Sequence, residues 1–107
     1  MKISDVAKRT GVTVRTLHYY DEIGLLPPSS VTASGYRVYS DADLEALQQI
    51  LFFRELDFSL EEIRKIMRNP AYKKEAALQK QKELLLQKRS RLDDLIALVD
   101  KTLKGER

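Results

Sequence analysis

The side chains with the clearest capacity for chemistry lie in residues 14–23. If this segment is helical, four polar side chains share one face, at about 100° per residue and over roughly a quarter of the circumference. An arginine chelates guanine or binds phosphate, whereas a tyrosine hydroxyl donates to phosphate and its ring covers sugars and thymine methyl groups. A face of this kind suits a helix that rests in the major groove of DNA. Its members are Arg15, His18, Tyr19 and Glu22, and the apolar Val14 and Leu17 lie away from them.

Two positions on or beside this face have more than one interpretation. Glu22 is unfavourable next to phosphates, so it either orients Arg15 or accepts a hydrogen bond from a cytosine amine. Tyr20 lies at the shoulder of the face, where it is equally compatible with DNA contact and with a place in the core. For Arg15 we favour DNA contact over simple solvation.

No arrangement typical of an enzyme or a metal site accompanies these residues. His18 is the only histidine and cysteine is absent, so we expect neither a zinc site nor a cofactor. Asp93 and Asp94 are adjacent on a predicted solvated helix, where they balance lysines. No Ser/His/Asp arrangement and no phosphate-binding glycine loop is present. The sequence therefore predicts a binding protein that is not an enzyme.

Helix start and stop signals place the polar face on the second helix of a helix-turn-helix. We expect Ser4 to cap a first short helix and Gly11 to end it. Thr13 is expected to cap the second helix, at about residues 14–23, and Gly24 to end that helix. A helix-turn-helix consists of two helices joined by a short turn that often contains glycine, although an ordinary helical hairpin shares most of these signals.

Residues 25–40 predict a small β-hairpin. Two prolines near the start of the segment prevent a helix from continuing, and the later G-Y-R-V-Y run is aromatic and β-branched. In an extended strand Tyr36 and Val38 face one way, while Arg37 and Tyr39 face the other. A two-stranded ribbon is marginal alone, so it must pack against the helices as a wing. Arg37 is then the best candidate for a phosphate or minor-groove contact outside the second helix.

Residues 40–70 predict two more helices with a protruding connection. Ser40 is expected to cap the third helix, and Ser59 to begin a capping box for the fourth. Arg54 and the loop that follows it are candidates for a second exposed edge. Phe58, in that loop, is predicted to plug the core.

From about Tyr72 to Leu103 the chain contains neither glycine nor proline. This predicts a helix of about 30 residues and about 45 Å, too long to fold back within so small a domain. Its apolar stripe has polar flanks in the earlier part and widens late, which favours an antiparallel pairing of two chains over a parallel zipper. The alternative is a single amphipathic helix that packs on another domain. The predicted dimerisation residues are Leu78, Leu85, Leu92, Leu95, Ile96, Val99 and Leu103.

Composition agrees with these elements without deciding the function. The net charge is +3 and the isoelectric point about 9.2, which is only a weak indication of a nucleic-acid partner. Residues 41–70 are acidic, with four Lys/Arg against seven Asp/Glu, so phosphate contacts there must come from individually placed side chains. The N-terminus does not resemble a signal peptide, and no apolar run is long enough to span a membrane, so we expect a cytoplasmic protein.

The expected fold class is therefore mostly α. A winged helix-turn-helix, made of four short helices and a small β-hairpin wing, is followed by a long C-terminal coiled-coil helix. We expect residues 1–70 to form the DNA-binding domain and residues 71–107 to form the dimerisation helix.

Two stretches of this sequence resemble a known family. Residues 12–26, VTVRTLHYYDEIGLL, and residues 35–40, GYRVYS, resemble the N-terminal signature of the MerR transcription regulators. Residues 41–56, DADLEALQQILFFREL, are similar more narrowly to the Mta/TipA multidrug-sensing subgroup. The resemblance covers essentially the whole chain. It implies a homodimer, joined by an antiparallel coiled coil, that binds a palindromic promoter and bends and untwists the DNA to realign promoter elements for RNA polymerase.

The resemblance also implies positions of DNA contact in the second helix, in the wing and near the loop that follows the third helix. Together with the residues argued above, the expected DNA-binding set is Thr13, Arg15, Thr16, His18, Tyr19, Tyr20, Tyr36, Arg37 and Arg54.

The sequence departs from the family pattern at its C-terminus. Members usually continue into an effector-binding domain, or place metal-binding cysteines after the dimerisation helix, and this sequence has neither. We therefore expect activation that does not need an inducer. Two other functions remain open: a coiled-coil protein whose small domain binds a protein partner, and an architectural or excisionase-like winged-helix factor without an activating role.

Overall fold

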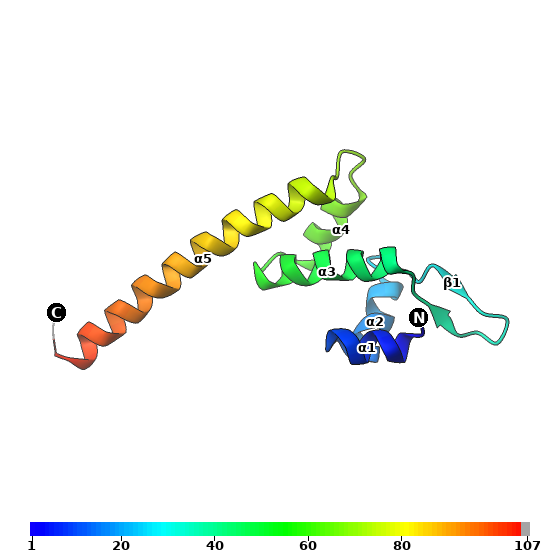
Figure 1. Cartoon of the computed structure of the whole chain (residues 1–107), viewed down its shortest axis with the longest axis horizontal. Helices are drawn as coiled ribbons and strands as arrows, with labels where there is room; N and C mark the ends of the chain where they lie inside the picture. Colours follow the sequence, from blue (N-terminus) through cyan, green and yellow to red (C-terminus); the bar gives the residue numbers. More distant parts are fainter. Residues whose placement is uncertain (106–107) are drawn as a thin grey trace. The chain divides into compact units, whose positions relative to one another are not determined.

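The structure is a computed structural model that describes residues 1–105, and it is mostly helical (Figure 1). It divides into two compact units, one of Met1–Tyr72 and one that begins at Lys73. The predicted class, a winged helix-turn-helix followed by a long helix, is confirmed. In order, the elements are α1 (Ile3–Thr10), α2 (Val14–Glu22), β1 (Ser30–Val31), β2 (Arg37–Val38), α3 (Asp41–Glu55), α4 (Leu60–Arg68) and α5 (Lys74–Leu103).

The helix-turn-helix consists of α1 and α2, which pack against each other. Gly11 ends α1 with a left-handed backbone (φ 76°), and the Thr13 side chain caps α2 by accepting from the backbone N–H of Thr16 at 3.0 Å. The prediction that Ser4 caps α1 is wrong. The helix begins two residues earlier, at Ile3, because Lys2 is extended and bridges to the wing at Val38, so the backbone turns helical directly after it.

The core of the first unit comes from every helix of that unit and from the segments on either side of the wing. Burial of these apolar side chains stabilises the fold by about 25 cal/mol for each Å² removed from water. The buried apolar residues are Val6, Leu17, Tyr20, Leu25, Leu26, Tyr39, Leu47, Ile50, Phe53 and Ile63.

The wing is a short antiparallel ribbon, with Ser30 opposite Val38. Such a ribbon is marginally stable by itself, and here contacts at its base attach it to the helices. The Arg37 Nε donates to Asp21 Oδ2 of α2 at 2.9 Å, and the backbone N–H of Ser29 donates to the Asp43 carboxylate of α3 at 3.0 Å. The wing therefore has a polar attachment to the second helix and another to the third.

Capping boxes begin the third and fourth helices, where the sequence predicts a Ser40 cap and a Ser59 capping box. Ser40 and Asp43 exchange side-chain-to-backbone hydrogen bonds at the start of α3, and Ser59 and Glu62 do the same at the start of α4. Asp57 lies in the connection between these helices with a positive φ of 65°, a conformation that aspartate tolerates better than most residues.

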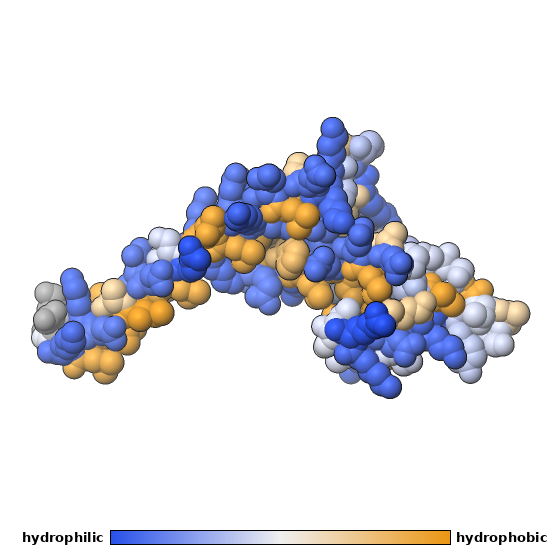
Figure 2. All heavy atoms as spheres, viewed as in Figure 1, coloured by the Kyte–Doolittle hydropathy of each residue, from blue (hydrophilic) through white to orange (hydrophobic). Residues whose placement is uncertain are grey.

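The second unit is the single helix α5, 30 residues long. Figure 2 shows apolar surface along the C-terminal half of this helix. Within residues 1–105, no helix combines the length and the apolar character that crossing a membrane requires.

We predict that the Asp21–Arg37 pair couples the wing to α2 weakly but measurably. The two side chains are 26% and 37% exposed, so solvent screening limits the coupling to about 0.2–1 kcal/mol. A double-mutant cycle with Asp21→Asn, Arg37→Gln and the combined variant, followed by chemical denaturation, measures it. Additive losses of stability in the two single variants would show that the pair contributes nothing.

We also predict that Tyr39 makes stability sensitive to alkaline pH. Burial raises the pKa of Tyr39, and the Asp21 carboxylate raises this pKa further, against an opposing effect of Arg37. The folded state thus favours the neutral phenol. This contribution is complete below the ordinary pKa of about 10 and is lost as pH rises through the raised pKa of the folded state.

The matched variant is Tyr39→Phe, because the Tyr39 hydroxyl is buried without a hydrogen-bond partner among residues 1–105. Its removal should change stability by less than about 1 kcal/mol near pH 7. Between pH 8 and pH 11 the variant should lose less stability than the unaltered chain in chemical denaturation. Equal losses in the two proteins would contradict the prediction.

Candidate nucleic-acid interface

The outer face of α2 carries the polar side chains that the sequence places together. Arg15, His18, Tyr19 and Glu22 are all exposed, and with Thr16 they line a shallow hollow in the surface. The opposite face of the same helix packs into the core, where Leu17 is fully buried. Burial of one face thus fixes which side chains of α2 are available to a partner.

Tyr20 belongs to the core and not to this face. Its side chain is 6% exposed, whereas the neighbouring Tyr19 is 48% exposed. Burial raises the pKa of Tyr20, and the nearby Arg54 guanidinium partly opposes this. Of the two interpretations that the sequence left open for Tyr20, the structure supports the core aromatic, because its shoulder position turns inward against the neighbouring elements.

Thr13 and Thr16 are occupied in starting the helix. In addition to the capping bond, the Thr13 hydroxyl donates to the Thr16 hydroxyl at 2.9 Å. Thr13 is exposed and Thr16 is half-buried, and the lining of the hollow includes Thr16 but not Thr13. Their local role is to fix where α2 begins, and with it the angular position of Arg15.

The wing presents one exposed aromatic side chain and one half-buried arginine. Tyr36 is 60% exposed, and the Lys2 ammonium lies 5.4 Å from the centre of its ring, a cation–π distance. Arg37 is held by Asp21 through one of the five N–H donors of its guanidinium, so this bond orients the group and leaves donors for a further partner. Sequence reasoning did not find Lys2, because only the tertiary pairing of residue 2 with β2 brings it to the wing.

Arg54 lies at the end of α3 and holds the next loop in place. Its Nη1 donates to the backbone carbonyl of Phe58 at 2.9 Å, and the Phe58 ring packs 5.2 Å from that of Phe53. Phe58 is half-buried, so the prediction that its side chain fills the core is confirmed only in part. Arg54 itself is exposed and remains available at this edge.

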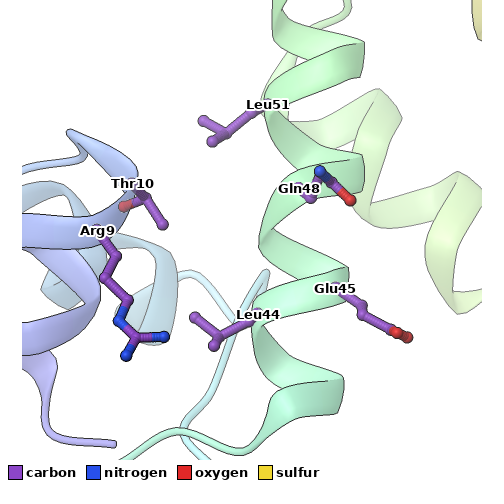
Figure 3. Close-up of a pocket in the computed structure, with 6 residues that line it drawn as sticks. All are labelled: Arg9, Thr10, Leu44, Glu45, Gln48 and Leu51. Atoms are coloured by element: carbon purple, nitrogen blue, oxygen red, sulfur yellow. The ribbon is translucent and has the colours of Figure 1, made fainter.

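A second hollow, of about 390 Å³, lies between α1 and α3 and contains none of the predicted site residues (Figure 3). Leu44 and Leu51 point toward α1, whereas the Glu45 side chain points away from α1. Across residues 1–105, no group of three His, Cys, Asp or Glu side chains is arranged to hold a metal ion. The full lining of the hollow is Arg9, Thr10, Leu44, Glu45, Gln48 and Leu51.

The predicted dimerisation residues share one face of α5, within about 100° of arc around the helix axis. Leu78 is half-buried, and the other six are exposed in the single chain. Their exposed fractions rise toward the C-terminus, from 40% at Leu85 to 80% at Leu103. Together these residues form an apolar stripe along α5 that is exposed in the single chain.

Comparison with known proteins gives matches over both units. The family model described as MerR HTH family regulatory protein matches residues 1–70, and the model described as MerR, DNA binding, matches residues 44–104. The chain is 53% identical over 102 residues to the HTH-type transcriptional activator mta of Bacillus subtilis (95% of this chain, 40% of the relative). It is 48% identical over 103 residues to the HTH-type transcriptional activator TipA of Streptomyces coelicolor (96% and 41%).

A solved structure agrees with these matches. The crystal structure of MtaN, the N-terminus of the Bacillus subtilis multidrug transporter activator, is 52% identical with a TM-score of 0.67, and the match covers 96% of this chain and 97% of that one. The chain spans about two fifths of the length of the two curated relatives. The matched proteins are transcription regulators and not enzymes. On the similarity of its sequence and of its fold, this chain belongs to the MerR family of helix-turn-helix regulatory proteins.

Proposed function

We propose that this chain binds a palindromic promoter as a homodimer and acts as a transcriptional activator. The outer face of α2 enters the major groove, the wing contacts the adjacent backbone, and α5 pairs with α5 of a second copy. Double-stranded DNA and RNA polymerase at the promoter are its partners, which places its action in the cytoplasm. The relatives mta and TipA are both described as activators, and this supports the activating role.

The observation that carries the proposal is the division of α2 into two faces. Leu17 and Tyr20 are buried, while Arg15, His18 and Tyr19 are exposed on the opposite side. The buried side holds the helix in place, so its outer side chains can reach base edges without further ordering of the backbone. Arginine is the residue that most often reads guanine in the major groove, which makes Arg15 the main candidate for base recognition.

The remaining candidates supply contacts to the sugar–phosphate backbone. In the wing, Tyr36 and Arg37 offer a hydroxyl and a guanidinium, and Lys2 adds a positive charge beside the Tyr36 ring. Arg54 offers a further guanidinium at the end of α3. Backbone contacts of this kind fix the register and orientation of a protein on DNA, and base contacts then give the sequence preference.

Dimerisation through α5 would place two reading helices on one duplex. In a dimer paired through α5, the two α2 helices are held at a set separation. The DNA must therefore bend and untwist for both helices to enter its major groove. Deformation of this order costs roughly 1–6 kcal/mol and is offset by the added contacts. Since the reading and pairing elements both lie within residues 1–105, we propose that these residues bind and distort the promoter without a small-molecule inducer.

The proposal predicts a salt-sensitive preference for inverted-repeat DNA. In fluorescence anisotropy, an inverted-repeat duplex from a candidate promoter should bind roughly a thousandfold more tightly than random duplex, the lower end of the specificity ratios of such proteins. The logarithm of the affinity should fall linearly with that of the salt concentration, by about 0.9 per phosphate contact. Equal, salt-insensitive binding to both duplexes would favour the alternative of a protein-binding module.

The same experiment with Arg15→Ala tests the recognition face. Loss of one bidentate arginine contact costs roughly 1–3 kcal/mol at each half-site, so binding to the inverted repeat should weaken by more than tenfold. Lys65→Ala is the matched control, because it removes an exposed positive charge from α4. An Arg15→Ala affinity equal to that of the control would remove Arg15 from the recognition face.

Circular-permutation electrophoresis without inducer measures the bend, and an unbent complex would reject the distortion part of the proposal.

Dimerisation through α5 is tested with Leu92→Lys. A charge within the apolar stripe would be desolvated in the dimer, so sedimentation velocity at micromolar concentration should show monomers, and affinity for the inverted repeat should fall. Ser90→Lys is the control, because it places the same charge about 160° around the helix from Leu92, on the side opposite the stripe. If both variants remain dimeric, the pairing face lies elsewhere.

A further inference from the structure

Positive charge near the C-terminal end of α2 would stabilise this helix, but its last turn contains no basic residue. The last carbonyl groups of a helix have no partner within the helix, and together they carry a partial negative charge. The last turn of α2 holds Asp21 and Glu22 and no basic residue. Both carboxylates are therefore unfavourable with respect to the helix dipole, and the end of this helix is intrinsically weak.

Two arginines of α4 meet this end of α2 from another part of the sequence. Arg64 Nη1 donates to the carbonyl of Ile23 at 3.0 Å, and Arg68 Nη2 donates to the carbonyl of Gly24 at 2.8 Å. The donors lie 41 and 44 residues from their acceptors along the chain. Arg64 and Arg68 are four residues apart on a helix, so both project from the same side of α4.

Gly24 makes the approach of Arg68 possible. Its φ is +72°, and a Cβ atom at this position would lie 2.8 Å from Arg68 Nη2. Any other residue here would combine an unfavourable backbone conformation with a clash against the guanidinium. The backbone N–H groups of Ile23 and Leu25 donate back into α2, to the carbonyls of Tyr19 and Tyr20, so the turn is closed from both directions.

Arg64 also lies close to the polar face of α2. It lines a shallow hollow together with Tyr19 and Ile23 of the α2 end and with Leu60 and Glu61 of the α4 start. Tyr19 and Glu22, the last members of the polar face, therefore lie on the turn that the two arginines hold.

We propose that Arg64 and Arg68 are positioning residues for DNA reading, which bind the carbonyl groups of Ile23 and Gly24 in the turn directly after α2 and so fix the orientation of the last turn of α2 against α4. This inference rests on the proposed function. It assigns to two basic residues a role other than phosphate contact, because their guanidinium groups donate to backbone carbonyls of the turn that ends the recognition helix. Their effect should therefore fall on sequence preference and not on general attraction to DNA.

The test compares Arg64→Met with Lys65→Met in the full 107-residue chain. Both variants lose one positive charge from α4, but Arg64 donates to the turn after α2, whereas Lys65 pairs with Glu61 on the surface of its own helix. Relative to Lys65→Met, we expect Arg64→Met to bind an inverted-repeat duplex roughly tenfold more weakly, the loss typical of one charge-assisted hydrogen bond. Binding to random duplex and the salt slope should equal those of the control.

Hydrogen exchange in the free protein gives a second measurement that does not depend on DNA. The amides of Ile23, Gly24 and Leu25 should exchange faster in Arg64→Met than in Lys65→Met, because the turn that they close has lost its external support. Arg64→Lys retains the charge but not the planar guanidinium, so it should give intermediate values. This conservative variant also serves if Arg64→Met proves too unstable to study.

Three results would overturn the inference. The first is an Arg64→Met protein that equals the control in both DNA binding and amide exchange. The second is an equal loss on inverted-repeat and random duplexes with a shallower salt slope, which would make Arg64 a phosphate contact. The third is unchanged amide exchange in both Arg64 variants. If the unaltered chain shows no preference for inverted repeats, the proposed function fails, whereas the exchange measurement still decides whether the arginines hold α2.

Discussion

The burial of one side of α2 is the constraint on which the rest of this molecule depends. Leu17 is fully buried and Tyr20 nearly so, and their packing fixes the rotation of the helix about its own axis. At about 100° per residue, Arg15 and Tyr19 lie on roughly the opposite side of the helix, so the burial of Leu17 and Tyr20 leaves them outside. The hydrophobic effect is not directional, but through this helix it determines which polar groups face outward.

Fixing the rotation of a helix is not sufficient to place its side chains, because its ends can still move. At the N-terminal end, the Thr13 hydroxyl accepts from the Thr16 amide and fixes the first turn. Near the other end, Asp21 holds Arg37 of the wing, and the guanidinium groups of α4 hold the carbonyls that follow the helix. Polar contacts therefore orient a helix whose main stabilisation is apolar, and they connect it to the wing and to α4.

The two units of the chain differ in whether their apolar side chains are buried within the single chain. In the first unit the core buries most of the large apolar side chains, although Val14 and Val31 stay exposed beside Tyr19 and Tyr36. In α5 the apolar stripe stays exposed in the single chain, so its burial requires a second surface. A chain with this division has one surface that is suited to a polyanion and another that is suited to an apolar partner.

The sequence by itself determined the features that depend on neighbouring residues. The caps at Thr13, Ser40 and Ser59, the stop at Gly11 and the unbroken helix α5 follow from local hydrogen bonding and backbone preference, which act over three or four residues. The family likeness lies in short runs of the same kind. These signals are sufficient for the order of elements and for the polar face of α2, since both are set by periodicity along one helix.

Only the tertiary structure decided what depends on contacts between distant segments. Tyr20 stood at the shoulder of a helical face, and the surrounding core, not its own spacing, turned it inward. Ser4 had the composition of a cap, but the pairing of Lys2 with the wing started α1 earlier. The partners of Asp21 and Gly24 lie 16 and 44 residues away, and no local pattern encodes such pairs, because chain folding alone brings them within hydrogen-bond distance.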